Sequence, residues 1–243
     1  MNFRIIFISL LFQSMFFNMV CAQHYIGFNA GYSTATFLDY KNDTNYDATY
    51  RFKNGLALSS FYETKIDSNV NFRIELQYNY QQSDLEVRNN AGKASFYKNL
   101  DFSSHLLNLH LVPSFRVFNK KNVQMNFSLG LVFSYNINTH AKGNGWDYIY
   151  KTGIDSSGNE FSFVSTQDWE KDERNSNELS RVNLGAVFGL SFRIPIHEKM
   201  DFLIQNNYRL FLTRAISMPY HTSMLIGDLS VGLRYRLGKK ELK

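Results

Sequence analysis

The chain has 243 residues, of which 44% are hydrophobic, 16% aromatic and 19% charged. This length suits a single domain with one sizeable core. The 15 Tyr and 22 Phe argue against a largely disordered chain, and a mean hydropathy of -0.31 argues against a bundle of transmembrane helices. The formal net charge is +5. Because the basic residues do not form one run, no nucleic-acid partner is expected.

The N-terminus has the pattern of a secretory signal peptide. Arg4 precedes an apolar run from Ile5 to Val20, and the small residues Cys21 and Ala22 follow it. We expect residues 1–22 to be removed and residues 23–243 to form the mature domain. A permanent anchor is less favoured, because the run is shorter than the roughly 20 apolar residues that a spanning helix needs. Lipidation of Cys21 is also less favoured, so the mature chain is expected to lack cysteine.

Apolar and polar residues then alternate along most of the chain. In residues 70–80, one face carries Val70, Phe72, Ile74, Leu76, Tyr78 and Tyr80, and the other carries Asn71, Arg73, Glu75, Gln77 and Asn79. The same period predicts eight strands, at residues 25–37, 50–62, 70–80, 107–117, 123–137, 182–194, 200–212 and 225–237. Each is close to the roughly 9–11 residues with which a tilted strand crosses a bilayer.

The connections between these strands alternate in length. Short polar segments are found at residues 64–69, 119–122 and 196–199, and long ones at 38–49, 81–106, 138–181 and 213–224. This alternation is typical of outer-membrane barrels, with short periplasmic turns and long extracellular loops. We predict an all-β, eight-stranded antiparallel up-and-down transmembrane β-barrel. Pro113 falls inside the fourth strand, where we expect a β-bulge.

A soluble barrel that buries the apolar face is the alternative. Three features favour lipid contact for that face instead. It is as long as a bilayer crossing, aromatic residues flank it, and long and short connections lie on opposite sides. The flanking aromatics are Tyr62, Phe72, Phe115 and Tyr235 toward the short turns, and Tyr32, Tyr50, Tyr80 and Tyr135 toward the long loops.

The order of these segments resembles a known family. The stretches IGFNAGYS (26–33), LLNLHLVPSFRV (106–117), LGLVFSY (129–135) and LSVGLRYRL (229–237) are similar to the PorT-like outer-membrane β-barrel proteins of Bacteroidota-type bacteria. These resemble outer membrane proteins A and X in fold. The resemblance covers the whole mature chain and implies a location in the bacterial outer membrane. Since most members have no assigned activity, it implies architecture more than chemistry, with an accessory role in protein secretion as one alternative.

The polar face would line the lumen, and its charges are mostly basic. The bases are Arg51, Lys53, Arg73, Arg116, Arg181, Arg193, Arg209, Arg234 and Arg236, and the acids are Glu75, Asp201 and Asp228. One interpretation is an anion-selective path. The other is a plug in which arginines pair with carboxylates and amides. We favour the plug, because eight strands leave room for little beyond side chains.

The longest connection, residues 138–181, holds both tryptophans. Residues 146–154 and 161–165 predict a hairpin that extends above the membrane. Trp146, Tyr148 and Trp169 are candidates for contact with a partner, and packing within the hairpin or over the barrel mouth is the alternative. The acidic stretch 165–180 is interpreted as a solvated segment, with cation bridges to lipopolysaccharide as the alternative.

One constellation raises an enzymatic alternative. Asp101, Ser103 and His105 occupy alternate positions and would share one strand face, as a lipid A esterase could require. The other histidines lack paired metal-ligand spacing, and no glycine-rich phosphate loop is present. We therefore predict no catalytic residue, metal or cofactor.

The preferred function is a non-enzymatic membrane scaffold or interaction protein that acts through its extracellular loops. A small anion-selective, porin-like channel is the first alternative, followed by the secretion accessory factor and the esterase. Expected partners are outer-membrane lipid, lipopolysaccharide, the outer-membrane assembly machinery, and an extracellular or secretion-system protein.

Overall fold

The computed structural model describes residues 23–39, 46–89, 96–120, 122–154, 157, 160–174, 180–213 and 222–238. The expected signal peptide lies outside this part of the chain. The described strands are β1 (His24–Asp39), β2 (Tyr46–Lys65), β3 (Val70–Asn89), β4 (Phe96–Lys120), β5 (Val123–Ile154), β6 (Glu160–Arg174), β7 (Val182–His197), β8 (Met200–Phe211) and β9 (Thr222–Leu237). Among the described residues, no helix is long and apolar enough to cross a membrane.

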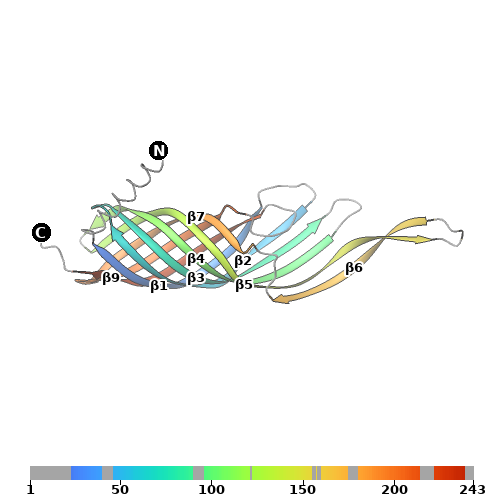
Figure 1. The fold of residues 1–243 in the computed structure, drawn as a ribbon, viewed down its shortest axis with the longest axis horizontal. Coiled ribbons are helices and arrows are strands. Elements are labelled where there is room, and N and C mark those ends of the chain that lie inside the picture. Colours follow the sequence, from blue (N-terminus) through green and yellow to red (C-terminus); the bar gives the residue numbers. More distant parts are fainter. Residues whose placement is uncertain are drawn as a thin grey trace, which may run out of the picture.

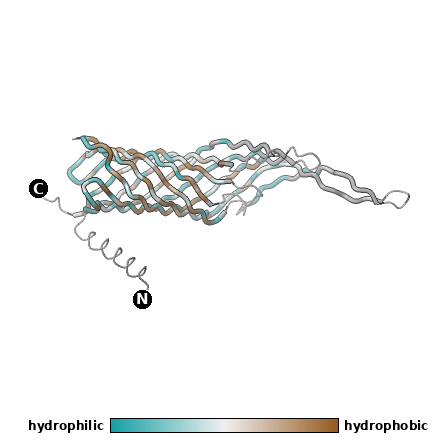
Figure 2. The backbone as a smooth tube through the Cα atoms, turned by 90° about the horizontal axis from the view of Figure 1, so that it is seen from above, coloured by the Kyte–Doolittle hydropathy of each residue, from teal (hydrophilic) through white to brown (hydrophobic). Residues whose placement is uncertain are grey.

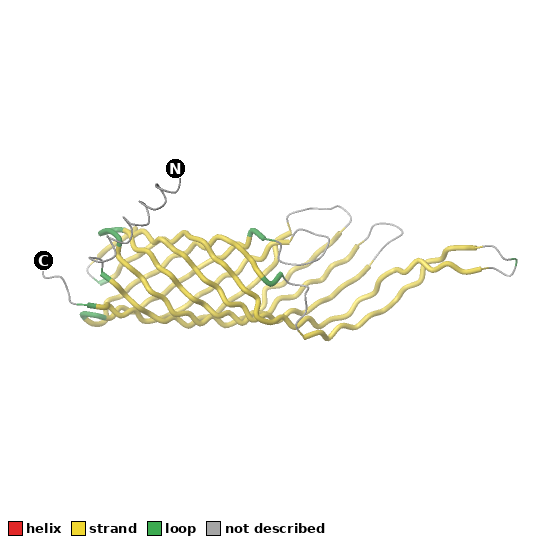
Figure 3. The backbone as a smooth tube through the Cα atoms, in the orientation of Figure 1, coloured by secondary structure: helices red, strands yellow, loops and turns green. Residues whose placement is uncertain are grey.

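Eight of these strands close into a barrel (Figures 1 and 3). The order is β4-β3-β2-β1-β9-β8-β7-β5, and β4 also pairs with β5. The first and last strands close the wall along their full length, from His24 opposite Leu237 to Asp39 opposite Thr222. Each pairing in this wall is antiparallel. The predicted eight-stranded antiparallel barrel is confirmed.

The two ends of the barrel differ as the connection lengths predict. The turns after β2, β4 and β7 are short and lie together at one end, here called the short-turn end. At the opposite, long-loop end the strands continue much further than the alternation indicated. β3 extends to Asn89, β4 begins at Phe96, and β5 runs to Ile154. Most of residues 81–106, expected to be a loop, is therefore strand.

The expected loop at residues 138–181 is also mostly strand. β6 pairs with the outer part of β5, from His140 opposite Arg174 to Ile154 opposite Glu160. The predicted hairpin is present, and its second strand also includes residues 165–174 of the segment interpreted as solvated. Figure 1 shows this hairpin reaching far beyond the barrel. Residues 175–179 lie outside the described part.

The outer wall of the barrel is apolar. Outward side chains that are exposed include Ile26, Phe28, Leu76, Leu109, Leu129, Leu131, Phe188, Leu190, Val231 and Leu233. Figure 2 shows the hydrophobic colouring concentrated over the barrel. Tyr62, Phe115 and Tyr235 border this surface toward the short turns, and Tyr32 and Tyr135 border it toward the long loops. Because the apolar face lies on the outside of the barrel, the soluble-barrel alternative, which would bury it, is wrong.

Pro113 causes no bulge, contrary to the prediction. It lies in register opposite Phe72 of β3. On its other side, pairing with β5 stops after Leu111 opposite Leu131 and resumes at Ser114 opposite Ser128, without a register shift. The wall thus accommodates the missing N–H by a local gap in one ladder, because the neighbouring pairs hold the strand in place.

Gly130 of β5 faces this gap and lets the two strands approach. A Cβ at this position would overlap the carbonyl oxygen of Leu111 and would lie 2.9 Å from the Cα of Val112. We expect Gly130→Ala to lower the free energy of unfolding by about 1–3 kcal/mol through overpacking. The matched control is Gly227→Ala, whose Cβ would meet its nearest atom at an ordinary 3.4 Å from Tyr208. Urea unfolding of refolded protein measures both, and equal midpoints would contradict the close approach.

Candidate functional site in the barrel lumen

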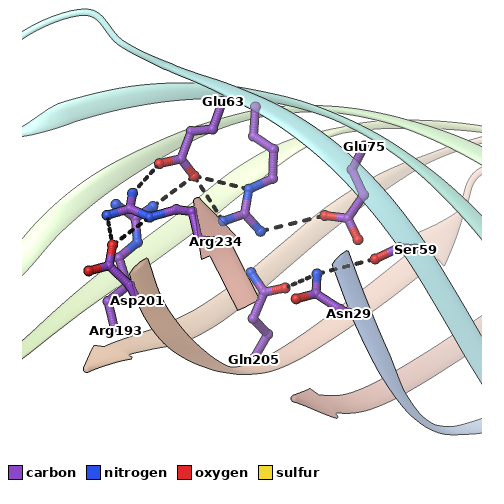
Figure 4. A network of polar contacts seen from close by, with 9 residues as sticks. Asn29, Ser59, Glu63, Glu75, Arg193, Asp201, Gln205 and Arg234 are labelled. Carbon is purple, nitrogen blue, oxygen red and sulfur yellow. Dashed lines mark hydrogen bonds and ion pairs between the residues drawn. The ribbon is translucent and has the colours of Figure 1, made fainter. Parts of the chain in front are cut away.

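The short-turn half of the lumen is organised around one buried carboxylate. Glu63 of β2 is completely buried and accepts hydrogen bonds from three arginines. Arg73 Nη2 and Arg193 Nη2 each lie 2.8 Å from Glu63 Oε2, and Arg234 Nη1 lies 2.7 Å from Glu63 Oε1. Glu75 contacts Arg73 at 3.6 Å. Figure 4 shows these side chains converging inside the wall.

Aromatic rings and a second carboxylate complete this arginine cluster. The guanidinium carbon of Arg73 lies 4.0 Å from the ring centroid of Phe61, and that of Arg234 lies 4.0 Å from the ring centroid of Tyr25. Arg234 Nε also donates to Asp201 at 2.8 Å. Stacked guanidinium groups that are also charge-paired are well suited to burial. The cluster therefore fills the lumen with side chains that hold one another in place.

The Glu63–Arg193 contact spans the lumen. Three strands separate β2 from β7 in either direction around the barrel, so the two strands face each other. A direct hydrogen bond of 2.8 Å therefore joins opposite walls. An open aqueous path through this level would have to pass between bonded side chains.

A second polar cluster lies closer to the long-loop end. Arg209 of β8 is fully buried, pairs with Asp228 of β9, and donates from Nη1 to Asn79 Oδ1 at 2.8 Å. Asn79 also accepts from Asn108 at 2.7 Å, and Gln77 donates to Asp228 at 3.4 Å. Since β3 and β8 also face each other, the Arg209–Asn79 contact again joins opposite walls.

Toward the long-loop end apolar side chains join polar ones such as Ser83 and Ser104 on the inward face. Here the buried side chains include Ala35, Leu100, Phe102, Leu106, Phe211, Met224 and Ile226. Ala35 and Ile226 are cross-strand partners. Hydrophobic residues at this level exclude water, so they continue the obstruction that the polar clusters begin.

The structure distributes the predicted lumenal charges unevenly. Six of those singled out are buried in the two clusters: Arg73, Glu75, Arg193, Arg209, Asp228 and Arg234. Arg116 and Arg236 are half-buried at the short-turn mouth. Arg51 and Arg181 are exposed, and Lys53 is half-buried beyond the apolar surface. The sequence pattern assigned nine basic and three acidic residues to the lumen. The structure buries only four of these bases there, so the lumen is less basic than predicted.

The central residue, Glu63, was missed because the second strand was predicted to end at Tyr62. The structure continues β2 to Lys65, which places Glu63 on the inward face with Phe61. The sequence contained a signal for this longer strand, because the alternation that places Phe61 inward also places Glu63 inward.

Asp101, Ser103 and His105 share the outward face of β4, as their spacing indicates. They are not assembled as a catalytic triad, however. His105 Nδ1 lies 2.6 Å from the hydroxyl of Tyr78, and Asp101 accepts from Lys53 at 3.3 Å. Asp101 therefore does not orient the imidazole, which the proposed chemistry requires.

Asp101 belongs instead to a charged group beyond the apolar surface. Lys53 bridges Asp84 and Asp101 from neighbouring strands. The hydrogen bond to Asp84 raises the pKa of Lys53. Burial raises the pKa of Asp84. The group links β2, β3 and β4 outside the membrane.

The three candidate contact residues lie on the long hairpin. Trp146 is half-buried and opposite Tyr97 of β4. The backbone of Tyr148 lies opposite Thr166, and that of Trp169 lies opposite Gly145. The side chains of Tyr148 and Trp169 fall outside the described part of the structure, so their role as contact residues stays a prediction.

Comparison with known proteins finds outer-membrane barrels among the similar solved structures. No curated protein matches the sequence significantly. Neisserial surface protein A is 12% identical with a TM-score of 0.43, covering 88% of this chain and 97% of that chain. OprG from Pseudomonas aeruginosa is 12% identical with a TM-score of 0.38, covering 90% and 97%. The outer membrane protease OmpT from Escherichia coli is 10% identical with a TM-score of 0.44, covering 89% and 96%.

At such identities and TM-scores these likenesses assign neither fold nor function to this chain. The family assignment comes from the sequence, because residues 21–195 match the outer membrane protein β-barrel domain family. That match covers more than half of the chain. The chain therefore belongs to the outer membrane protein β-barrel domain family and resides in the bacterial outer membrane.

Proposed function

We propose that this protein is a non-conducting barrel that anchors an extended β-sheet at the cell surface as an interaction scaffold. The long-loop end faces the exterior, as is usual for outer-membrane barrels. The observation that carries the proposal is the pair of hydrogen-bonded contacts, Glu63–Arg193 and Arg209–Asn79, that cross the lumen between opposite strands. They support an anchoring role over the anion-channel alternative.

The part beyond the barrel supports the interaction role. β2, β3, β4, β5 and β6 continue as neighbours past the ends of β1, β7, β8 and β9, and Figure 1 shows them extending from one side of the barrel mouth. In the described part of this extension β6 pairs only with β5. Such a sheet, fixed to a rigid barrel, presents strand surface and edge to molecules outside the cell.

Single-channel recording tests the non-conducting barrel. We expect refolded protein in a planar bilayer to show no discrete openings, because bonded side chains cross the lumen at two levels and apolar residues follow. A porin recorded under the same conditions controls for the assay, and a heat-dependent gel shift of recovered protein verifies that it is folded. Discrete, anion-selective openings would contradict the proposal and support the channel alternative.

The resemblance to PorT-like barrels favours protein secretion as the second candidate role for the scaffold. A deletion strain tests this directly. Loss of secreted proteins from the medium would support the secretion role, and normal export would exclude it.

A further inference from the structure

Charges in the short-turn half of the lumen do not balance. Arg73, Arg193 and Arg234 form the arginine cluster, and the acids within its contacts are Glu63, Glu75 and Asp201. These six groups compensate one another. Two further inward-facing arginines, Arg116 and Arg236, have no carboxylate within ion-pair distance in the part of the chain that the structure describes.

The two uncompensated arginines lie on opposite walls at the same end of the barrel. Arg116 lies on β4 and Arg236 on β9, and three strands separate these in either direction, so they face each other. The backbone N–H of Arg116 donates to Asn69 and that of Arg236 donates to Lys199, both at 2.8 Å. Asn69 and Lys199 belong to the short turns. Both arginines therefore sit at the short-turn mouth and point inward from opposite walls.

Within the described residues, several buried polar atoms in the short-turn half of the lumen have no hydrogen-bond partner. The Nε atoms of Arg116, Arg193 and Arg236 are buried without a hydrogen-bond acceptor. Asn126, the cross-strand partner of Arg116, is fully buried, and neither of its amide atoms has a partner. The same is true of the Ser114 hydroxyl oxygen.

The chemistry of these atoms indicates which kind of ligand would bind. A guanidinium N–H can only donate, so three of the unpartnered atoms require an acceptor. Water could accept from them, but it would leave two positive charges uncompensated in a confined space. A tetrahedral oxyanion offers several acceptors and negative charge together, and arginine pairs with it in a bidentate geometry.

We propose that the short-turn mouth of the lumen binds one small oxyanion of the phosphate or sulfate class. Arg116 and Arg236 hold it from opposite walls, and the Asn126 amide provides a further donor. Because Arg116 and Arg236 are half-buried, the site is open to solutes from the short-turn side. The proposal does not depend on the scaffold function, since the site lies at the other end of the barrel.

Calorimetric titration of refolded protein with inorganic phosphate, in a phosphate-free maltoside detergent, tests the site. We expect saturable binding with one site per chain. Arg116→Gln and Arg236→Gln should each weaken binding at least tenfold, because each removes one of the two uncompensated charges. Arg181→Gln is the matched control, since Arg181 is exposed beyond the long-loop end, and it should bind as the unaltered protein does.

The heat-dependent gel shift verifies that each variant is folded before titration. If one of the two arginine variants does not fold, the other carries the test alone. Absence of saturable binding by folded, unaltered protein would overturn the proposal, and so would equal binding by the two arginine variants and the Arg181 control.

A second titration, with a short-chain phospholipid added, distinguishes free phosphate from a lipid headgroup. If the phospholipid competes with inorganic phosphate for binding, the natural ligand of the site is the phosphate of a lipid headgroup. Unchanged phosphate binding would support a free oxyanion.

Discussion

Glu63→Ala is expected to lower the free energy of unfolding by about 3–5 kcal/mol, as removal of one partner from a buried ion pair does. Glu63 accepts from Arg73, Arg193 and Arg234, and all three guanidinium groups are buried. Without the carboxylate they repel one another in a region that water cannot readily solvate. The fraction of protein in the fast-migrating folded form on an unheated gel, followed against urea concentration, measures the change.

Two further variants separate the charge of Glu63 from its shape. Glu63→Gln keeps the volume and one acceptor oxygen, so its unfolding midpoint should lie between those of the unaltered protein and Glu63→Ala. Glu198→Ala removes an exposed acid in the turn between β7 and β8 and should change the free energy by less than about 0.5 kcal/mol. If Glu63→Ala and Glu198→Ala unfold at the same urea concentration, the arginine cluster does not stabilise the barrel.

The barrel was predictable because its wall separates two different environments. Lipid on one side and a polar lumen on the other impose a period of two on each crossing strand, and Leu109 outside and His110 inside show the contrast directly. Closure followed from the even number of crossings and the alternating connections. The supposed bulge at Pro113 failed because a closed wall can lose one ladder contact without changing register.

The extension beyond the barrel was harder to predict for the same physical reason. Above the membrane both faces of a strand can meet water, so alternation marks only residues 146–154 and 161–165 and is absent from residues 140–145 and 166–174. The strand structure there depends on pairing between β5 and β6, and the sequence showed only part of this hairpin.

The lumenal clusters depend on contacts between distant residues. Glu63 bonds to Arg193 on the opposite wall and to Arg234 two strands away, and no local pattern connects their positions in the chain. The inward parity of each residue could be inferred, but not which carboxylate each arginine would select. That choice requires strand order and register, which bring opposite walls within side-chain reach.

The pair formed by Arg209 and Asp228 offers the second large effect. Both side chains are buried, at 0% and 2% exposure, and they contact each other directly. Arg209→Met and Asp228→Leu should each lower the free energy of unfolding by about 3–5 kcal/mol, because each leaves the opposite charge buried and unpaired. Urea titration on unheated gels measures the two single variants and the double variant together.

The double variant decides what the pair contributes. Each single variant is expected to lose stability mainly because one charge stays buried without its partner. The double variant should then lose about 0.5–3 kcal/mol less unfolding free energy than the two single variants lose together. Recovery should be incomplete, because Asn79 and Gln77 also bond to the pair and would lose these partners. Simple additivity would mean that the Arg209–Asp228 contact is not the source of either loss. If the double variant folds and still conducts no ions, the lumen is blocked by the side chains that fill it. The ion pair then determines which side chains contact each other.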